Sequence, residues 1–180
     1  MATNQALVEV IYRILSGGAT PGAATTFAGS LGFKEERAAA ADPQAAWQTI
    51  FTIAGGLVAI TGLIGVRTVI QAGGASTMQF RHSVGPTVLD NGAAVITGNA
   101  VGTIYVLTGD IADPIQVGAA GVVVESGRLV PTSGMYGSLP MFIVGAGNVQ
   151  VTMTAAAGTG STRYIMTYIP LDTAATVVAA

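Results

Sequence analysis

The run from Ile50 to Ile70, IFTIAGGLVAITGLIGVRTVI, constrains the fold more than any other part of the chain, because it carries one charge, Arg67. A helix of this length would cross a bilayer, which takes about 20 apolar residues. The run, however, holds four glycines, each costing about 1 kcal/mol in a helix interior relative to alanine. It is also rich in β-branched residues, which pack well on a pleated sheet. The composition therefore favours strands over a membrane helix, which remains the weaker alternative.

Alternation within this run predicts how the strands lie. From Val58 onward the even-numbered residues are almost all apolar and branched, whereas the odd-numbered ones include Thr61, Gly65 and Arg67. A period of two predicts a strand with its even face buried and its odd face mixed. Gly55-Gly56 then marks a turn between strands at 48–54 and 57–72. We expect a long buried strand, or a hairpin.

The chain beyond residue 44 repeats this pattern of short apolar runs separated by glycine, Asp-Pro or Asn-Gly. Strands are predicted at 76–82, 93–96, 103–108, 115–125, 140–144, 148–155 and 162–169. Asp90-Asn91-Gly92 predicts a hairpin-type turn, and the last two strands are expected to pair as a hairpin. Closely spaced strands without helices predict an all-β fold over residues 45–180, a β-sandwich or a barrel. We favour a β-sandwich of jelly-roll or Greek-key type, which would use this many strands.

Residues 1–44 differ from this body and are predicted to form an extended arm. Apolar spacing over residues 4–15 predicts a short helix, and KEERAAAA at 34–41 predicts a further turn or two before Asp42-Pro43. The arm has too few core-forming residues to offset its own ordering entropy. We expect a neighbouring subunit to order it, and the body to fold without it.

Charge and composition bear on the kind of activity. Charged residues make up 9% of the chain, against roughly 25% in ordinary soluble domains. The seven positive residues are spread singly, so no basic stripe is available for nucleic acid. There is no cysteine, and the one histidine, His82, has no acidic neighbour to orient it as a base. We expect no catalytic residue, no metal and no cofactor, and hence not an enzyme.

Asp110 and Asp113 share the loop GDIADP, and two interpretations of them are weighed. Turn chemistry explains both, because Asp caps its own backbone and Asp-Pro commonly opens turns. A Ca²⁺ site is the less favoured alternative.

Apolar side chains in predicted loops suggest a binding surface. Tyr105, Met135, Tyr136, Met141 and Phe142 either line a protein interface or cap the ends of the core, and the two interpretations are equally supported. The residues predicted to contact a partner are Leu7, Ile11, Phe27, Phe33, Trp47, Tyr136 and Met141.

Three segments carry a resemblance to a known group: AGGLVAITGLIGVRTVIQAGGASTMQF, GTIYVLTGDI and RYIMTYIPLDTAATVVAA. They resemble capsid decoration, or cement, proteins of tailed double-stranded DNA bacteriophages, which have jelly-roll-like folds. The resemblance implies a homotrimer on the outer capsid surface of the virion that binds between major capsid subunits and stabilises the shell. It also implies that the arm reaches an adjacent capsomer. From the spread positive charges and the strand pattern, we expect neither nucleic acid nor membrane as a partner.

Two alternatives stay open. One is a minor virion protein of the tail, connector or vertex spike, including a receptor- or sugar-binding module that uses loops 110–114 and 134–139. The weaker one is a small membrane protein that spans with residues 50–70.

Overall fold

The computed structural model describes residues 32–43, 45–71, 75–85, 87–92, 94–109, 111–112, 114–120, 142–154 and 160–180. These residues form strands and turns and no helix, so the predicted all-β class is confirmed. The strands are β1 (Phe33–Ala41), β2 (Gln48–Ala54), β3 (Val58–Val69), β4 (Thr77–His82), β5 (Thr87–Val88), β6 (Ala94–Val95), β7 (Ile104–Val106), β8 (Gln116–Gly118), β9 (Phe142–Val144), β10 (Gly147–Thr154), β11 (Ser161–Pro170) and β12 (Thr176–Ala179).

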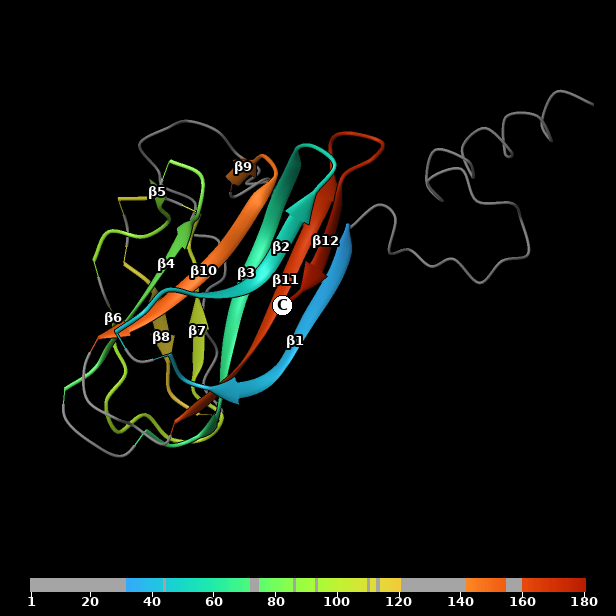
Figure 1. The fold of residues 1–180 in the computed structure, drawn as a ribbon. Coiled ribbons are helices and arrows are strands. Elements are labelled where there is room, and N and C mark those ends of the chain that lie inside the picture. Colours follow the sequence, from blue (N-terminus) through green and yellow to red (C-terminus); the bar gives the residue numbers. More distant parts are fainter. Residues whose placement is uncertain are drawn as a thin grey trace, which may run out of the picture. The chain divides into compact units, whose positions relative to one another are not determined.

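The strands form two six-stranded sheets (Figure 1). The first sheet has the order β1-β11-β3-β7-β8, and β9 pairs with the first residues of β3. The second has the order β12-β2-β10-β4-β5, and β6 pairs with the other end of β4. From β1 to β4 the chain alternates between the two sheets. The stretch from Ile50 to Ile70 is thus β2, a turn and β3, as predicted, but β2 and β3 lie in different sheets rather than in one hairpin.

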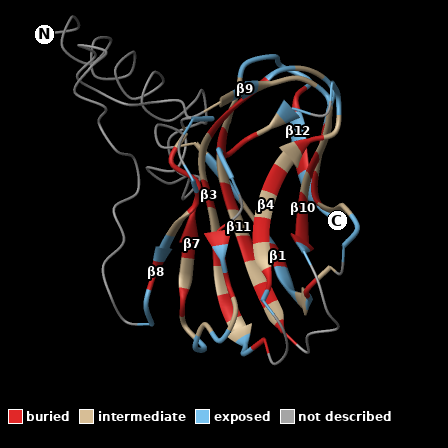
Figure 2. Ribbon diagram, turned by 90° about the vertical axis from the view of Figure 1, so that its left-hand side faces the viewer, coloured by how far each residue is buried: buried red, intermediate tan, exposed pale blue. Residues whose placement is uncertain are grey.

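The hydrophobic core lies where the inner faces of the two sheets meet. Buried and partly exposed residues alternate along β4 and β11, as Figure 2 shows. Phe80 of β4 and Tyr164 of β11 pack edge to face across the two sheets, with ring centroids 6.1 Å apart. This is a favourable arrangement for aromatic rings.

The predicted buried face of β3 is correct only for the first part of the strand. Val58 and Ile60 are buried, but beyond them the buried residues are Leu63, Gly65 and Arg67. The pairing with β11 shifts here, because Tyr168 lies opposite Ile60 and Thr167 lies opposite Gly62. A β-bulge at this point inserts one residue and moves every later side chain to the other face. The odd-numbered residues therefore turn inward, and Arg67 becomes a core residue.

The predicted hairpin between the last two long strands is wrong. β10 pairs with β2 and β4 in the second sheet, whereas β11 pairs with β3 in the first. Alternation identified both strands correctly, but it carries no information about which sheet a strand joins.

The predicted hairpin turn at residues 90–92 is also wrong, for a different reason. β5 and β6 do not pair with each other: both run antiparallel to β4, one opposite each of its ends. The segment between them interrupts a single strand, and Gly92 has a φ of 97° there. Asp90 substitutes for the missing backbone carbonyl, because its carboxylate accepts a hydrogen bond of 2.7 Å from the Phe80 amide.

The predicted helix at 34–41 is a strand, β1, which pairs with β11 at the edge of the first sheet. The compact unit that contains both sheets runs from Lys34 to Ala180. The predicted helix at 4–15 lies outside the described residues. Nowhere in the described ranges is there a helix with the length and apolar character needed to cross a membrane.

Candidate functional site

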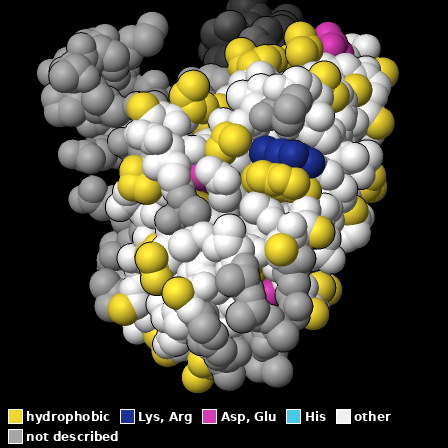
Figure 3. Space-filling view, turned by 60° about the vertical axis from the view of Figure 1, so that its left-hand side comes forward, with side chains coloured by type: hydrophobic (Ala, Val, Ile, Leu, Met, Phe, Trp, Pro, Cys, Tyr) yellow, Lys and Arg dark blue, Asp and Glu magenta, His cyan; other side chains and the backbone are white. Residues whose placement is uncertain are grey.

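An apolar surface lies at one end of the two sheets, formed by turns and by the short strand β9. Its residues are Leu57 before β3, Val84 after β4, Ile143 in β9 and Leu171 after β11, with 44%, 60%, 61% and 49% of their surfaces exposed. We call these four residues the apolar end. In Figure 3, apolar side chains gather along the upper end of the face shown. The sequence analysis did not single out these residues, although Leu57 and Val84 each stand beside a glycine turn.

Close backbone contacts hold the apolar end in place. The Leu171 amide donates to the Leu57 carbonyl at 2.9 Å, and the Leu57 amide donates to the Asp172 carboxylate at 2.7 Å. Gly55 has a φ of 75°, and a Cβ there would lie 1.9 Å from the Ala174 carbonyl oxygen. Only glycine therefore fits at this point, and the turns that present Leu57 and Leu171 are locked together.

The surface around the apolar end is poor in charge. Of the charged residues that the structure describes, four are buried: Arg37, Asp42, Arg67 and Asp90. The accessible ones are Lys34, Glu35 and Glu36 of β1, Arg163 of the neighbouring β11, Arg81 of β4, and Asp172, which follows Leu171 in the apolar end. Apart from the edge at β1, the described surface thus has two accessible charges, and the face in Figure 3 shows this sparseness.

Uncharged polar side chains cover the outer face of the second sheet. Gln150 of β10 accepts a hydrogen bond of 2.8 Å from Arg81 of β4 and reaches Thr49 of β2 at 3.4 Å. The Arg81 guanidinium stacks on the Trp47 ring at 4.2 Å from its centroid. This face can donate and accept hydrogen bonds, but the cation already covers one side of the indole ring.

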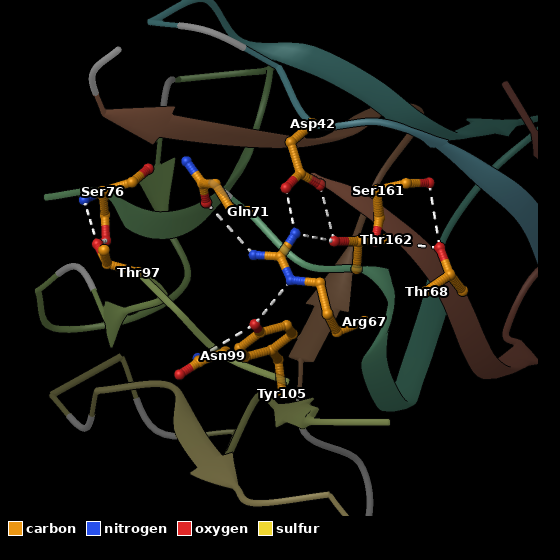
Figure 4. A network of polar contacts seen from close by, with 10 residues as sticks. All are labelled: Asp42, Arg67, Thr68, Gln71, Ser76, Thr97, Asn99, Tyr105, Ser161 and Thr162. Atoms are coloured by element: carbon orange, nitrogen blue, oxygen red, sulfur yellow. Dashed lines mark hydrogen bonds and ion pairs between the residues drawn. The ribbon is translucent and has the colours of Figure 1, made fainter. Parts of the chain in front are cut away.

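A buried polar cluster centred on Arg67 lies at the other end of β3 (Figure 4). The Arg67 side chain has no exposed surface, and it forms an ion pair with Asp42, whose side chain is also buried. Thr162 of β11 donates to the Asp42 carboxylate at 2.8 Å and accepts from Arg67 at 3.1 Å. Arg67 also donates to the Tyr105 hydroxyl at 3.2 Å. The cluster joins the end of β1 to β3, β7 and β11, and the side chains of its ion pair are enclosed by the protein.

Tyr164 lies deep beside this cluster. Burial raises the pKa of its hydroxyl, and the nearby Asp42 carboxylate raises it further. The phenol therefore stays protonated and cannot act as a base at neutral pH.

Two further buried titratable groups lie elsewhere in the second sheet. Burial raises the pKa of Asp90 to about 6, although the hydrogen bond from Phe80 opposes this shift. His82 is buried beside the β9–β10 turn, where a Cβ on Gly147 would come within 2.7 Å of its Nε2 atom. In the described part of the chain, no three His, Cys, Asp or Glu side chains gather closely enough to hold a metal ion.

The structure describes two of the seven predicted partner-binding residues. Phe33 opens β1 with 54% of its surface exposed, and Trp47 is half-buried beneath Arg81. Leu7, Ile11, Phe27, Tyr136 and Met141 lie outside the described residues, as do Asp110 and Asp113.

Tyr105 and Phe142 are among the residues that were predicted either to line a protein interface or to cap the ends of the core. Tyr105 is fully buried in β7, so the interface interpretation is wrong for it. Phe142 is partly buried and packs against the core. The sequence analysis also missed that Arg67 is buried. The one indication in the sequence was that Arg67 is a lone charge inside an apolar run.

No family model matches the chain, and neither does any curated protein or solved structure. Its function is therefore inferred from its own residues, from its geometry and from the resemblance described above.

Proposed function

We propose that this chain is a virion structural protein: a capsid decoration, or cement, protein that binds between major capsid subunits on the outer shell and stabilises it. The observation that carries the proposal is the charge-poor surface with exposed aliphatic side chains at the apolar end. Protein interfaces are depleted of charge at their centres, and contiguous apolar surface marks interaction sites.

Rigidity of the apolar end supports the same role. Leu57 and Leu171 lie on turns joined by backbone hydrogen bonds, and Ile143 lies on β9, which pairs with β3. A preorganised surface loses little conformational entropy when it docks. Binding to the assembled shell, and not to free subunits, stabilises the shell by mass action.

We propose the jelly-roll form of the sandwich for this fold. An eight-stranded jelly roll consists of two Greek keys distributed over two sheets. The orders β1-β11-β3-β7 and β2-β10-β4-β5 support this assignment, since the chain crosses between the sheets as two Greek keys require. β12 then adds a strand beside β2.

The resemblance adds the oligomeric state and the partners. A homotrimer would place three copies of the apolar end against major capsid subunits, and the arm would reach a neighbouring capsomer. Neither nucleic acid nor membrane is a partner in this proposal.

The abundance of the protein in purified source particles tests the proposal. We expect a copy number close to that of the major capsid protein, measured by quantitative mass spectrometry. A handful of copies per particle would favour the tail, connector or vertex alternative, and complete absence would refute a virion role.

A pair of variants tests the surface itself. We expect Ile143→Asp to abolish binding to particles that lack the protein, because it places a charge within the apolar end. Val95→Asp is the matched control: Val95 is 65% exposed, and β6 pairs with the far end of β4. Equal binding by both variants would exclude the apolar end as the contact.

The receptor- or sugar-binding alternative has one observation in its favour, the polar outer face of the second sheet. Arg81, Gln150 and Thr49 form a hydrogen-bonded row there beside an indole ring. Binding of the isolated protein to host-surface glycans, lost in Gln150→Ala, would support this alternative.

A further inference from the structure

We infer that β1 is an exchangeable strand: it pairs with β11 of a second copy of this chain and places its Asp42 against Arg67 of that copy. The inference concerns the assembly of the chain with itself, and it does not rest on the proposed virion role. Three features of β1 carry it: its contacts, its anchor and its linker.

The contacts of β1 are polar and peripheral. None of the buried residues that form the hydrophobic core comes from Phe33–Ala41. Besides its pairing with β11, the strand is held by Arg37, which donates to the Ala180 oxygen at 2.7 Å, and by Glu36, which lies 3.0 Å from Arg163. Since β1 contributes no side chain to the core cluster, its release leaves the residues of that cluster in place.

The anchor of β1 is specific and buried. Asp42 forms an ion pair with Arg67, accepts from Thr162, and donates its amide to the Gly160 carbonyl at 2.9 Å. Removing β1 leaves Arg67 as an unpaired charge with no exposed surface, a state that is strongly disfavoured. The vacated position therefore selects a strand ending in a carboxylate with the same spacing, and an identical β1 supplies it. Exchange of identical elements forms such dimers at little cost, because every native contact is remade.

The linker between β1 and β2 is short and strained. It contains Pro43 and Ala45, and Ala45 has a φ of 51°. Among the described residues, no other non-glycine residue has a positive φ. Alanine is unfavourable in this region. The Ala45 amide also donates to the Met153 carbonyl of β10 at 2.8 Å. A linker that extends toward another copy therefore releases strain but gives up this hydrogen bond. Trp47, stacked beneath Arg81, fixes the far end of the linker to the body.

Charge exchange between positions 42 and 67 tests the inference. Asp42→Arg and Arg67→Asp each bury two like charges when the strand closes on its own chain. We expect each variant alone to lose roughly 10 °C of thermal midpoint. When the two variants are refolded together, strand exchange pairs opposite charges at both sites. The mixture should then form a heterodimer, seen by native mass spectrometry, and regain most of the lost midpoint.

A mixture that keeps the two separate low midpoints and forms no heterodimer would overturn the inference. The inference is also overturned if each variant folds alone but the mixture contains no heterodimer.

If the charge variants fail to fold, two variants of the linker provide a second test of strand exchange. Ala45→Gly relieves the strain of the closed form, so we expect it to lower the dimer fraction after refolding at high concentration several-fold relative to wild type. Ala46→Gly adds the same flexibility beside it without relieving a positive φ, and it should leave that fraction nearly unchanged. Equal fractions for the two variants, or a wild type that stays monomeric at every concentration, would refute strand exchange.

Discussion

Arg67 shows at the scale of one residue how a charge is kept inside a β-sandwich. Its guanidinium reaches Asp42, Thr162 and Tyr105, which come from three different segments. The ion pair does not by itself make the fold more stable than a well-packed apolar pair would. Instead, burial of the ion pair destabilises every arrangement in which Arg67 or Asp42 lacks the other.

A double-mutant cycle tests this interpretation. We expect Arg67→Met and Asp42→Ala each to lower the free energy of unfolding by roughly 3–5 kcal/mol, because each leaves a buried charge unpaired. The double variant should lose less than the sum of the two, since no unpaired charge remains. The free energy of unfolding of each protein is measured by urea unfolding, and an m-value that is the same for all of them makes the values comparable. Strictly additive losses would contradict the coupling.

Asp90 makes a prediction about pH. The pKa of Asp90 is raised by burial to about 6, whereas the ordinary value is 3.8. Between these values the folded state binds more protons than the unfolded state, so this group's contribution to stability is full below pH 4 and is lost as the pH rises through about 6. Asp90→Asn should remove this dependence and be more stable than wild type at pH 7, by roughly 3 kcal/mol at most. The two proteins are compared by urea unfolding from pH 3.5 to 7.5, and a constant difference would contradict the shift.

At the scale of elements, β10 is the strand whose buried face the sequence predicted clearly. Val149, Val151 and Met153 alternate with polar residues, and all three are buried. β10 lies between β2 and β4, so its inner side chains sit at the centre of the second sheet.

Val151→Asp should therefore disrupt folding, because it places a carboxylate among core side chains. Gln150→Glu on the opposite face of the same strand is the control, since Arg81 lies beside it. We expect the circular dichroism melt of the first variant to lose its cooperative transition and that of the second to stay near wild type. An unchanged thermal midpoint for Val151→Asp would show that the face is wrongly assigned.

β1 changes the truncation experiment that the sequence suggests. Deleting residues 1–44 removes β1 together with Asp42 and leaves Arg67 unpaired, whereas deleting residues 1–32 retains both. We expect the shorter deletion to keep nearly the full free energy of unfolding and the longer one to lower it by several kcal/mol, roughly 3–5 from the ion pair alone. Equal stability of the two proteins would show that β1 and its anchor contribute little.

At the scale of the whole molecule, the two sheets leave an end and an outer surface with few charges. A free protein with such a surface tends to self-associate, because few charges keep its molecules apart. In the proposed function, assembly with other subunits covers it. We therefore expect both the body and the segment before β1 to contribute to binding the particle.

The deletion of residues 1–32 also tests this division. Because the apolar end is retained, we expect the truncated protein to bind particles that lack it, but with reduced affinity. Sedimentation of bound protein with the particles gives the ratio to full-length protein. Full-strength binding by the truncated chain would exclude a role for residues 1–32.

The sequence by itself determined the all-β class and most strand positions, because alternation and turn residues are local properties. β2 has the bounds predicted for it, and β10 and β11 are within a residue of theirs. β5 and β12 were missed, since short strands give little periodic signal. The helix predicted over residues 34–41 failed because its alanine-rich local propensity was overridden by pairing with β11.

Only the tertiary structure decided which sheet each strand joins and which face of β3 is buried. The bulge in β3 depends on its register with β11, and the partners of Arg67 stand 25 and 95 residues away in the chain. Such contacts gain their energy only when distant segments meet, and no local pattern records them. For the same reason the apolar end, built from three turns and the short strand β9, became visible only once the chain was folded.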